Sequence, residues 1–410
     1  MSAKPNKMKP LPQKFIERTK AVMGEERYSR YTQALENEPS VSIRINPFKW
    51  HCSEGEPVPW CSEGRYLAKR PDFTLDPLLH GGAYYVQEAS SMFVAYLLRQ
   101  LVKEPVKMLD LCAAPGGKST AARTVLPDES VLFANEPNGK RAQILLENIQ
   151  KFGHERVVVT QCWPRDFGES GLLFDVMLAD VPCSGEGMFR KDDVAIDEWS
   201  EANVRMCQQR QREIVSDAWD CLRKDGLLIY STCTLNTEEN EENVRWIAEE
   251  LGAEPVDVPV EPDWGITGSL LKGYAAPVYR FIPGYTRGEG LFMAALRKIS
   301  DTANASKSRS KKPLRTLANG IEPPTKKGND IVPSHAEALS RGLDRTKYPM
   351  QELARNEALS YLRRETLIFS SEVPKGYVVV CYEGVPLGFV KNLGTRANNL
   401  YPQNWKIRKL

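Results

Sequence analysis

Short apolar runs alternate with amphipathic stretches through the middle of the chain, between residues 106 and 295. Runs this short between polar turns indicate buried strands, and the amphipathic stretches between them indicate helices. Strands that alternate with helices form a parallel sheet covered on both faces, so the pattern predicts an α/β core. The predicted strands are residues 106–111, 131–135, 157–160, 174–180 and 226–231.

The two ends of the chain follow other patterns. Residues 15–35 carry apolar side chains at helical spacing, and residues 41–45 alternate as a half-buried strand does, which predicts a small α+β unit. A further helix is predicted over 87–102. Near the other end, residues 334–366 hold helical signals, and two apolar runs around Glu383-Gly384 predict a β-hairpin.

Between the core and this hairpin lies a stretch poor in large apolar residues. Residues 307–327 contain seven basic residues and one acidic residue, which indicates a solvated linker and, as a second interpretation, a contact with phosphate. The last twenty residues are basic and include Tyr401 and Trp405, which suits RNA but also suits a small β domain that buries its aromatic rings. We therefore divide the chain into 1–75, a catalytic domain 76–298, a flexible basic linker 299–333 and a C-terminal domain 334–410.

Composition limits the function classes. The chain has 410 residues, and its 55 basic and 53 acidic residues give a net charge of +2, so a polyanion site must come from local clustering. Its apolar runs are too short to span a membrane and it lacks a signal peptide, which predicts a cytoplasmic protein. The nine cysteines include no Cys-x-x-Cys pair, so we expect free thiols and no metal site.

A glycine-rich turn follows the first predicted strand of the core. Two glycines let the backbone approach a ligand closely, and the free N–H groups of a following helix favour a polar group. The spacing excludes a Walker A loop and a dinucleotide fingerprint, but Glu136 stands 20 residues after Gly116, where a Rossmann-like site places the carboxylate that binds a ribose. One ribose without a pyrophosphate points to S-adenosylmethionine; the alternative is an ordinary turn with a solvated acid. The turn consists of Cys112, Ala113, Ala114, Pro115, Gly116, Gly117 and Lys118.

Two cysteines follow later strands of the core. Cys183 lies in Asp180-Val-Pro-Cys183 and Cys233 in Ser231-Thr-Cys233. If these strands are neighbours, Asp180 and both thiols meet at the carboxyl edge of the sheet, where α/β proteins bind ligands. A free cysteine is often simply buried, but Asn236 and Glu239 predict a helix start whose dipole favours a thiolate at Cys233.

A thiol beside a methyl donor suits methylation of a pyrimidine at ring carbon 5. That carbon must first be made electron-rich, and a thiolate that adds to carbon 6 does this. Asp180 then suits contact with the ring nitrogen as a base contact or proton donor, and Cys183 is a candidate for product release. Methylation of an exocyclic amine typically uses an Asn/Asp-Pro-Pro-aromatic loop, which the chain lacks here. The residues alone leave open which thiol is the nucleophile.

At these three motifs the chain resembles the Sun-type RNA (cytosine-5) methyltransferases, and most closely the bacterial RsmF-like group that modifies 16S ribosomal RNA. The resemblance also covers residues 42–47 and 84–92 and extends weakly into the last 80 residues. It implies a Rossmann-like class I methyltransferase core between two small α+β domains that bind RNA, the C-terminal one PUA-like. It also implies that Cys233 is the nucleophile, that Cys183 assists release, and that Cys112 to Lys118, Glu136 and Asp180 contact the cofactor.

The chain departs from this family at one position. Relatives place an acid after the third strand to bind the adenine amino group, and here Trp163 stands in that register with Asp166 three residues later. Either Asp166 substitutes, or Trp163 stacks on the adenine, or its ring packs on its own domain. After Met188-Phe189, the pair Arg190-Lys191 has two readings: a clamp on RNA or an ordinary surface pair.

We therefore expect an S-adenosylmethionine-dependent enzyme that forms 5-methylcytosine in folded RNA. The predicted substrate is 16S ribosomal RNA, either free or in the assembled small subunit, and the protein is expected to be a monomer with no membrane partner. The target base must leave its helix to reach the thiol. Two alternatives remain: a transfer RNA methyltransferase with the same chemistry, and an RNA-binding ribosome assembly factor that keeps a vestigial methyltransferase fold.

Overall fold

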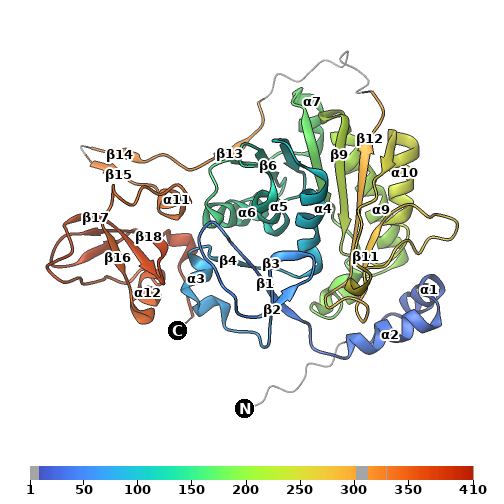
Figure 1. The fold of residues 1–410 in the computed structure, drawn as a ribbon, viewed down its shortest axis with the longest axis horizontal. Coiled ribbons are helices and arrows are strands. Elements are labelled where there is room, and N and C mark those ends of the chain that lie inside the picture. Colours follow the sequence, from blue (N-terminus) through green and yellow to red (C-terminus); the bar gives the residue numbers. More distant parts are fainter. Residues whose placement is uncertain (1–8, 302–312, 329, 410) are drawn as a thin grey trace.

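The computed structural model describes residues 9–301, 313–328 and 330–409. Among these residues a nine-stranded sheet forms the centre of the molecule (Figure 1), in the order β10-β12-β9-β8-β5-β6-β7-β13, with β11 also paired to β12. The strands that match the predicted runs are parallel, which confirms the α/β core. They are β5 (Lys107–Asp110), β6 (Val131–Asn135), β7 (Val157–Thr160), β8 (Phe174–Asp180) and β9 (Leu222–Thr232).

Antiparallel strands extend the sheet on both sides. β12 (Leu291–Lys298) pairs with β9, and β10 (Ala253–Pro255) and β11 (Tyr279–Phe281) pair with β12. At the other edge β13 (Thr316–Asn319) pairs with β7. The parallel strands therefore lie inside the sheet, where both of their faces are covered.

Two helical layers cover this sheet. α4 (Phe93–Leu101), α5 (Gly117–Val125) and α6 (Gly139–Phe152) pack on one face, and α7 (Pro164–Ser170), α9 (Glu201–Ala218) and α10 (Glu241–Leu251) pack on the other. Burying such apolar faces contributes about 25 cal/mol per Å². The helix predicted over 87–102 begins as α4 only at Phe93, after a 3₁₀ turn at Ser90–Met92.

The N-terminal unit is α+β as predicted. Its strands β1 (Val41–Ile45), β2 (Glu56–Val58), β3 (Cys61–Leu67) and β4 (Tyr84–Val86) form a sheet in the order β2-β3-β1-β4, with α3 (Pro77–His80) before β4. The single helix predicted over 15–35 is instead two, α1 (Gln13–Met23) and α2 (Glu25–Leu35). Gly24 separates them with a φ of 78°, a value that an interior helical residue does not adopt.

The C-terminal part forms its own sheet, in the order β16-β17-β18-β19. The predicted hairpin is confirmed: Glu383 and Gly384 both have positive φ and join β17 to β18, as a type I′ turn requires. Tyr401 and Trp405 are buried in this domain, so their rings serve its core. The elements are α11 (His335–Leu339), β16 (Met350–Glu352), α12 (Arg355–Leu362), β17 (Gly376–Tyr382), β18 (Val385–Asn392) and β19 (Ala397–Asn399).

The stretch predicted as a flexible linker is partly regular structure. Residues 302–312 lie outside the described residues, but β13 belongs to the central sheet, and β14 (Thr325–Lys327) pairs with β15 (Asp330–Val332). Composition could not reveal this, because the main-chain hydrogen bonds of an added edge strand do not depend on large side chains. The domain boundaries themselves stay a prediction.

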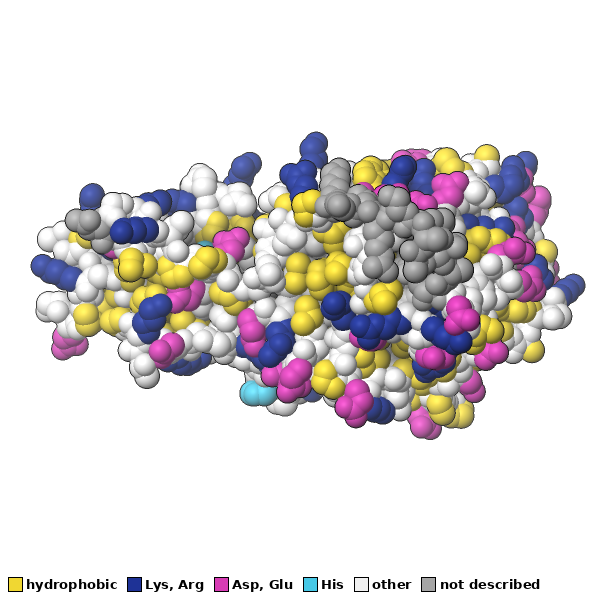
Figure 2. All heavy atoms as spheres, turned by 90° about the horizontal axis from the view of Figure 1, so that it is seen from above, with side chains coloured by type: hydrophobic (Ala, Val, Ile, Leu, Met, Phe, Trp, Pro, Cys, Tyr) yellow, Lys and Arg dark blue, Asp and Glu magenta, His cyan; other side chains and the backbone are white. Residues whose placement is uncertain are grey.

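The surface carries both signs of charge. Figure 2 shows acidic and basic side chains interspersed along the face seen from above, as the small net charge leads one to expect. Among the described residues, no helix is long and apolar enough to cross a membrane.

Candidate active site

The glycine-rich turn joins β5 to α5 and is held in place by α6. Arg141 donates to the carbonyl of Ala114 at 2.9 Å, and Asn148 donates to that of Pro115 at 2.8 Å. Gly116 has a φ of 114°, a left-handed value that favours glycine. Within the described residues no side chain caps the start of α5, so its first N–H groups are available to a ligand beside the turn.

Two buried carboxylates stand beside this turn. Glu136 follows β6, is 2% exposed and accepts a hydrogen bond from the N–H of Asn138 at 2.9 Å. The main-chain bond from Ala113 to Asn135, 2.7 Å long, brings the two strand ends together. Asp110 ends β5, and burial raises its pKa to about 7. Its Oδ1 has no hydrogen-bond partner within the described part of the chain.

These features fit S-adenosylmethionine. The uncapped start of α5 and the left-handed Gly116 suit a ligand that lies against the backbone, and Glu136 offers a carboxylate for ribose hydroxyls. The unpartnered oxygen of Asp110 lies at the same edge of the sheet. Burial raises the pKa of the Cys112 thiol, which therefore stays neutral in this turn.

The structure brings Asp180, Cys183 and Cys233 together. β8 and β9 are neighbours, and Asp180 pairs with Ser231 in their register. The sulfur atoms of Cys183 and Cys233 are 3.1 Å apart, and the N–H of Cys233 lies 3.3 Å from the Cys183 sulfur. The two thiols therefore share one hydrogen bond, in which one sulfur is the donor and the other the acceptor.

The environment distinguishes the two thiols. The hydrogen bond from Cys183 lowers the pKa of Cys233, and the Lys118 ammonium acts in the same direction. The same bond and burial raise the pKa of Cys183. Lys118 in turn donates to Asp180 at 2.9 Å, which places the cofactor turn, the carboxylate and the thiols in one cluster. Cys233 is thus the sulfur that more readily becomes a thiolate.

The cause of the lowered pKa of Cys233 differs from our prediction, which assigned it to a helix dipole. Asn236 does accept a hydrogen bond from the N–H of Glu239, but this pair forms a separate turn, and α10 begins only at Glu241. The helix dipole falls off within one turn, so it acts weakly on Cys233, eight residues before that start. Cys183 and Lys118 take its place.

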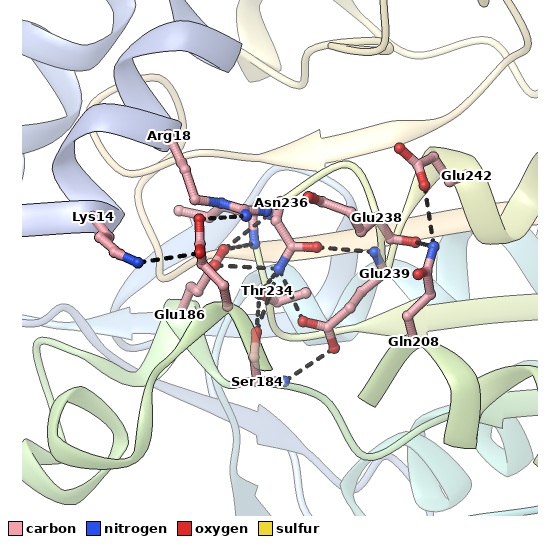
Figure 3. Close-up of polar contacts among 12 residues, drawn as sticks. Lys14, Arg18, Ser184, Glu186, Gln208, Thr234, Asn236, Glu238, Glu239 and Glu242 are labelled. Atoms are coloured by element: carbon pink, nitrogen blue, oxygen red, sulfur yellow. Dashed lines mark hydrogen bonds and ion pairs between the residues drawn. The ribbon is translucent and has the colours of Figure 1, made fainter. Parts of the chain in front are cut away.

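A buried polar network, which the sequence did not reveal, joins the two cysteine turns (Figure 3). Glu186, three residues after Cys183, accepts hydrogen bonds from the N–H groups of Leu235 and Asn236 at 2.8 and 2.9 Å. It also accepts from the Trp199 indole at 2.8 Å. These bonds tie the chain after Cys183 directly to the chain after Cys233.

Glu239 closes the same network from the other side. It accepts hydrogen bonds from the N–H of Ser184 at 3.0 Å, from Gln211 at 2.7 Å and from the Asn236 amide at 2.9 Å. Burial raises its pKa to about 7. The Asn236 amide also donates to Glu186 at 3.2 Å, so a single side chain connects both carboxylates. Glutamates spaced like these commonly lie on solvated surfaces, so sequence spacing alone offered no signal.

Of the other residues that the sequence singled out, Asp166 and Phe189 have partners within the protein, whereas Trp163 is exposed. Asp166 accepts a hydrogen bond from the N–H of Trp163 at 2.8 Å and so caps α7. The Trp163 ring is 65% exposed. Phe189 is buried against Phe15, with ring centroids 5.0 Å apart, so it is not available to stack on a base.

Arg190 is a structural residue. It contacts both carboxylate oxygens of Glu289, at 2.8 and 3.0 Å, and donates to the carbonyl of Ala34 at 2.8 Å. Arg190 is therefore neither a clamp on RNA nor an ordinary surface residue. It anchors the turn to the N-terminal unit. Lys191 remains partly exposed, with its Nζ 3.6 Å from Glu289.

Family models match most of the chain. Residues 96–297 match the model described as 16S rRNA methyltransferase RsmB/F. Residues 11–89 match the N-terminal domain of 16S rRNA methyltransferase RsmF, and residues 350–407 match the methyltransferase RsmF PUA domain. These matches confirm the resemblance that the three motifs indicated and the PUA type of the C-terminal domain.

Individual relatives agree. The chain is similar to the ribosomal RNA small subunit methyltransferase F of Erwinia tasmaniensis, with 28% identity over 88% of this chain and 86% of the relative. The enzyme of the same name from Klebsiella pneumoniae is 28% identical over 96% of both chains. Among solved structures, a methyltransferase homolog from Pyrococcus horikoshii has a TM-score of 0.61 and 26% identity, over 70% of this chain and 95% of that one. NSun6 from the same organism, solved with SFG, shares the fold at a TM-score of 0.60 and 21% identity, over 71% of this chain and 99% of that one.

Proposed function

Since this chain belongs to the RsmB/F family of 16S rRNA methyltransferases, we propose that it methylates carbon 5 of a cytosine in 16S rRNA through a covalent bond from Cys233. The chain is an S-adenosylmethionine-dependent methyltransferase that acts on ribosomal RNA. The observation that carries the proposal is the pair of thiols 3.1 Å apart beside Lys118 and Asp180. Methylation of an exocyclic amine or a ribose hydroxyl has no use for such a pair.

S-adenosylmethionine supplies an electrophilic methyl group when it is bound. We propose that the turn from Cys112 to Lys118 holds it with Glu136 at its ribose and Asp180 beside its reactive end. Trp163 is proposed to stack on the adenine, because its ring is exposed while Asp166 is occupied as a helix cap. An exposed indole gains both apolar burial and stacking energy from such a contact.

The first chemical step uses the polarised thiol. The Cys233 thiolate adds to carbon 6 of the cytosine, a C–S bond forms, and the electron pair of the C5–C6 bond moves toward carbon 5 and the ring nitrogen N3. Asp180 takes a proton from solvent and donates it to N3, which stabilises the charge that develops there; the proton returns to Asp180 when the ring is restored. The addition makes carbon 5 nucleophilic enough to take a methyl group.

Release of the product uses the second thiol. After carbon 5 has gained its methyl group, its proton must leave before the ring can regain its double bond. Cys183 lies 3.1 Å from Cys233, and once Cys233 is bonded to carbon 6 its charge no longer raises the pKa of Cys183. We propose that Cys183 then gives its own proton to solvent and accepts the proton of carbon 5 as a thiolate. The C–H electron pair then forms the C5–C6 double bond, and the C–S bond breaks to restore Cys233.

The C-terminal PUA domain supports RNA as the partner. We further propose that the protein works as a monomer in the cytoplasm, and that the assembled small subunit is one form of its substrate. The cytosine must swing out of its stack to reach Cys233, because both thiols are half-buried at the end of the sheet.

The test compares two single variants on purified 16S rRNA, assembled small subunits and transfer RNA, with labelled S-adenosylmethionine. We expect Cys233→Ala to reduce turnover at least about 10³-fold, a loss of about 4 kcal/mol of transition-state stabilisation. Cys183→Ala should trap a protein–RNA adduct that migrates as a shifted, ribonuclease-sensitive band on a denaturing gel.

Cys52→Ala is the matched control, because that thiol is also half-buried but follows no strand of the core sheet. It should behave as the wild type. Turnover by Cys233→Ala at the wild-type rate would refute the nucleophile, and clean turnover by Cys183→Ala without an adduct would refute its role in release. Transfer of label to transfer RNA alone would refute the ribosomal substrate.

A further inference from the structure

A large groove runs between the N-terminal unit and the chain after Cys183. Its volume is about 1250 Å³. Segments 35–42, 67–70 and 86–88 line it, together with Arg190, Lys191 and Arg287. None of the proposed catalytic or cofactor residues is among the lining residues, so the groove is a separate feature beside the active site.

Two contacts connect the groove to the catalytic cluster. Gln87 lines the groove, and its side-chain amide lies 3.6 Å from the position that a Cβ atom on Gly117 would occupy. The residue after Gly117 is Lys118, which donates a hydrogen bond to Asp180. Glu88, which also lines the groove, accepts a hydrogen bond from the N–H of Glu289 at 3.1 Å. The neighbouring Gly290 packs so closely on Gly187 that neither position has room for a side chain.

Gly187 also donates a main-chain hydrogen bond to the carbonyl of Cys233 at 2.9 Å. One continuous path of contacts therefore leads from the groove wall to the nucleophilic turn. The groove wall and the turn that carries Cys233 are therefore packed parts of one region of the protein.

The residues that line the groove carry charges of both signs. Two of the arginines already have partners within the protein. Arg190 forms an ion pair with Glu289, and Arg287 forms an ion pair with Glu56 and lies over the Tyr66 ring. Lys69 and Arg70 are exposed, and Lys69 has no hydrogen bond or ion pair within the described part of the chain. Arg70 lies over the Phe73 ring at 5.3 Å, with its guanidinium otherwise open to solvent.

Segment 35–42 also lines the groove, beside segment 67–70, and carries two exposed acids, Glu36 and Glu38. Carboxylates repel phosphate but accept hydrogen bonds from the exocyclic amino groups of bases. A single strand can place its phosphates at Lys69, Arg70 and Lys191 and its bases at Glu36 and Glu38, so it suits both the basic and the acidic lining residues. A duplex does not, because its bases are paired inside and its phosphates face outward on both sides.

From this arrangement we infer that the groove binds the single-stranded RNA that flanks the target cytosine. The inference rests on the proposed function for its substrate and adds the path by which the strand reaches Cys233. Basic grooves that follow a backbone while bases contact the wall are a general mode of single-strand binding.

The experiment measures binding without cofactor, so that it does not depend on turnover. The probe is an oligocytidylate of about 12 nucleotides, alone or paired with oligoguanylate. We compare the wild type with Lys69→Glu/Arg70→Glu over about 50–200 mM salt. Loss of two phosphate contacts should weaken single-strand binding at least about tenfold and reduce the slope of log K against log salt by about 1.4.

Arg205→Glu/Arg210→Glu is the matched control, since both arginines are exposed on α9 and line no part of the groove. It should bind within about twofold of the wild type, and both double variants should keep the wild-type melting temperature and affinity for S-adenosylhomocysteine. Equal single-strand binding by the wild type and the groove variant would overturn the inference, and so would a loss confined to the duplex. Failure of the wild type to methylate 16S rRNA would refute the proposed function while leaving this binding result intact.

Discussion

Trp163 illustrates how one residue changes the chemistry of a shared site. It follows β7, at the position where the family resemblance leads one to expect an acid, and its ring is 65% exposed. The acid three residues later, Asp166, is bound to the N–H of Trp163. At this position the chain therefore exposes a large aromatic ring instead of a carboxylate, and we propose that this ring covers the adenine.

We expect Trp163→Ala to weaken binding of S-adenosylhomocysteine about five- to tenfold, because stacking of aromatic rings contributes about 0.5–1.5 kcal/mol beyond their burial. Trp163→Phe should retain most of the affinity but lose the change in tryptophan fluorescence that accompanies binding. Calorimetry and fluorescence titration provide these two measurements. Trp50→Phe, in the N-terminal unit, serves as the fluorescence control. Wild-type affinity in Trp163→Ala would show that the ring does not cover the adenine.

At the scale of elements, the two turns that follow β8 and β9 behave as one unit. β8 and β9 fix the positions at which the turns begin, but the bonds of Glu186 to Leu235 and Asn236 fix how the turns approach each other. Asn236 adds the link to Glu239. The separation of the thiols therefore depends on a network that contains no sulfur (Figure 3).

Glu186→Gln tests this dependence. A glutamine must place an N–H₂ group where Glu186 now accepts from Trp199 or from the turn after Cys233, and a buried donor that faces a donor costs about 1–3 kcal/mol. We expect a lower melting temperature and a higher pH midpoint for alkylation of Cys233, because the hydrogen bond from Cys183 is weakened. Thermal unfolding and mass spectrometry of iodoacetamide-treated protein check both effects. The same change at Glu198, which is exposed, should leave both values unaltered. An unshifted alkylation midpoint in Glu186→Gln would contradict the positioning role.

At the scale of the whole molecule, the C-terminal domain is held against the catalytic core. Arg341 pairs with Glu155 at 2.6 Å and with Asp128 at 2.8 Å, and its N–H donates to the carbonyl of Gly153 at 2.9 Å. α11 lies against α6, and α6 also holds the cofactor turn (Figure 1). This contact fixes the distance between the PUA domain and the active site.

Arg341→Ala should loosen this contact. The hydrogen bond from Arg341 lowers the pKa of Glu155 from 4.5 to about 2, so the contribution of this pair is complete above about pH 4.5 and is lost as the pH falls toward 2. The difference in melting temperature between the wild type and Arg341→Ala should therefore be largest near neutral pH and should narrow below about pH 4.5. Hydrogen exchange of α11 should also increase. Because Glu155 is partly exposed, we expect only a modest effect.

Lys391→Ala is the control, since Lys391 on β18 pairs with Asp330 on β15 and not with a residue of α11. It should leave hydrogen exchange of α11 unchanged. A difference in melting temperature between the wild type and Arg341→Ala that stays constant from pH 7 to pH 3 would show that Glu155 does not support the docking through its charge.

The residue pattern predicted the parallel strands, the glycine turn after β5 and a cysteine after each of two strands; that these strands are neighbours, so that the thiols meet, came from the fold. The predicted features follow from local periodicity and from the rule that parallel strands place their carboxyl ends at one edge. Four further features became visible only in the folded chain: Cys183 polarises Cys233, Glu186 joins both turns, Arg190 is an anchor and β13 extends the sheet. Each of these depends on contacts between segments far apart in the chain, whose partners share no spacing or composition that a linear pattern could register.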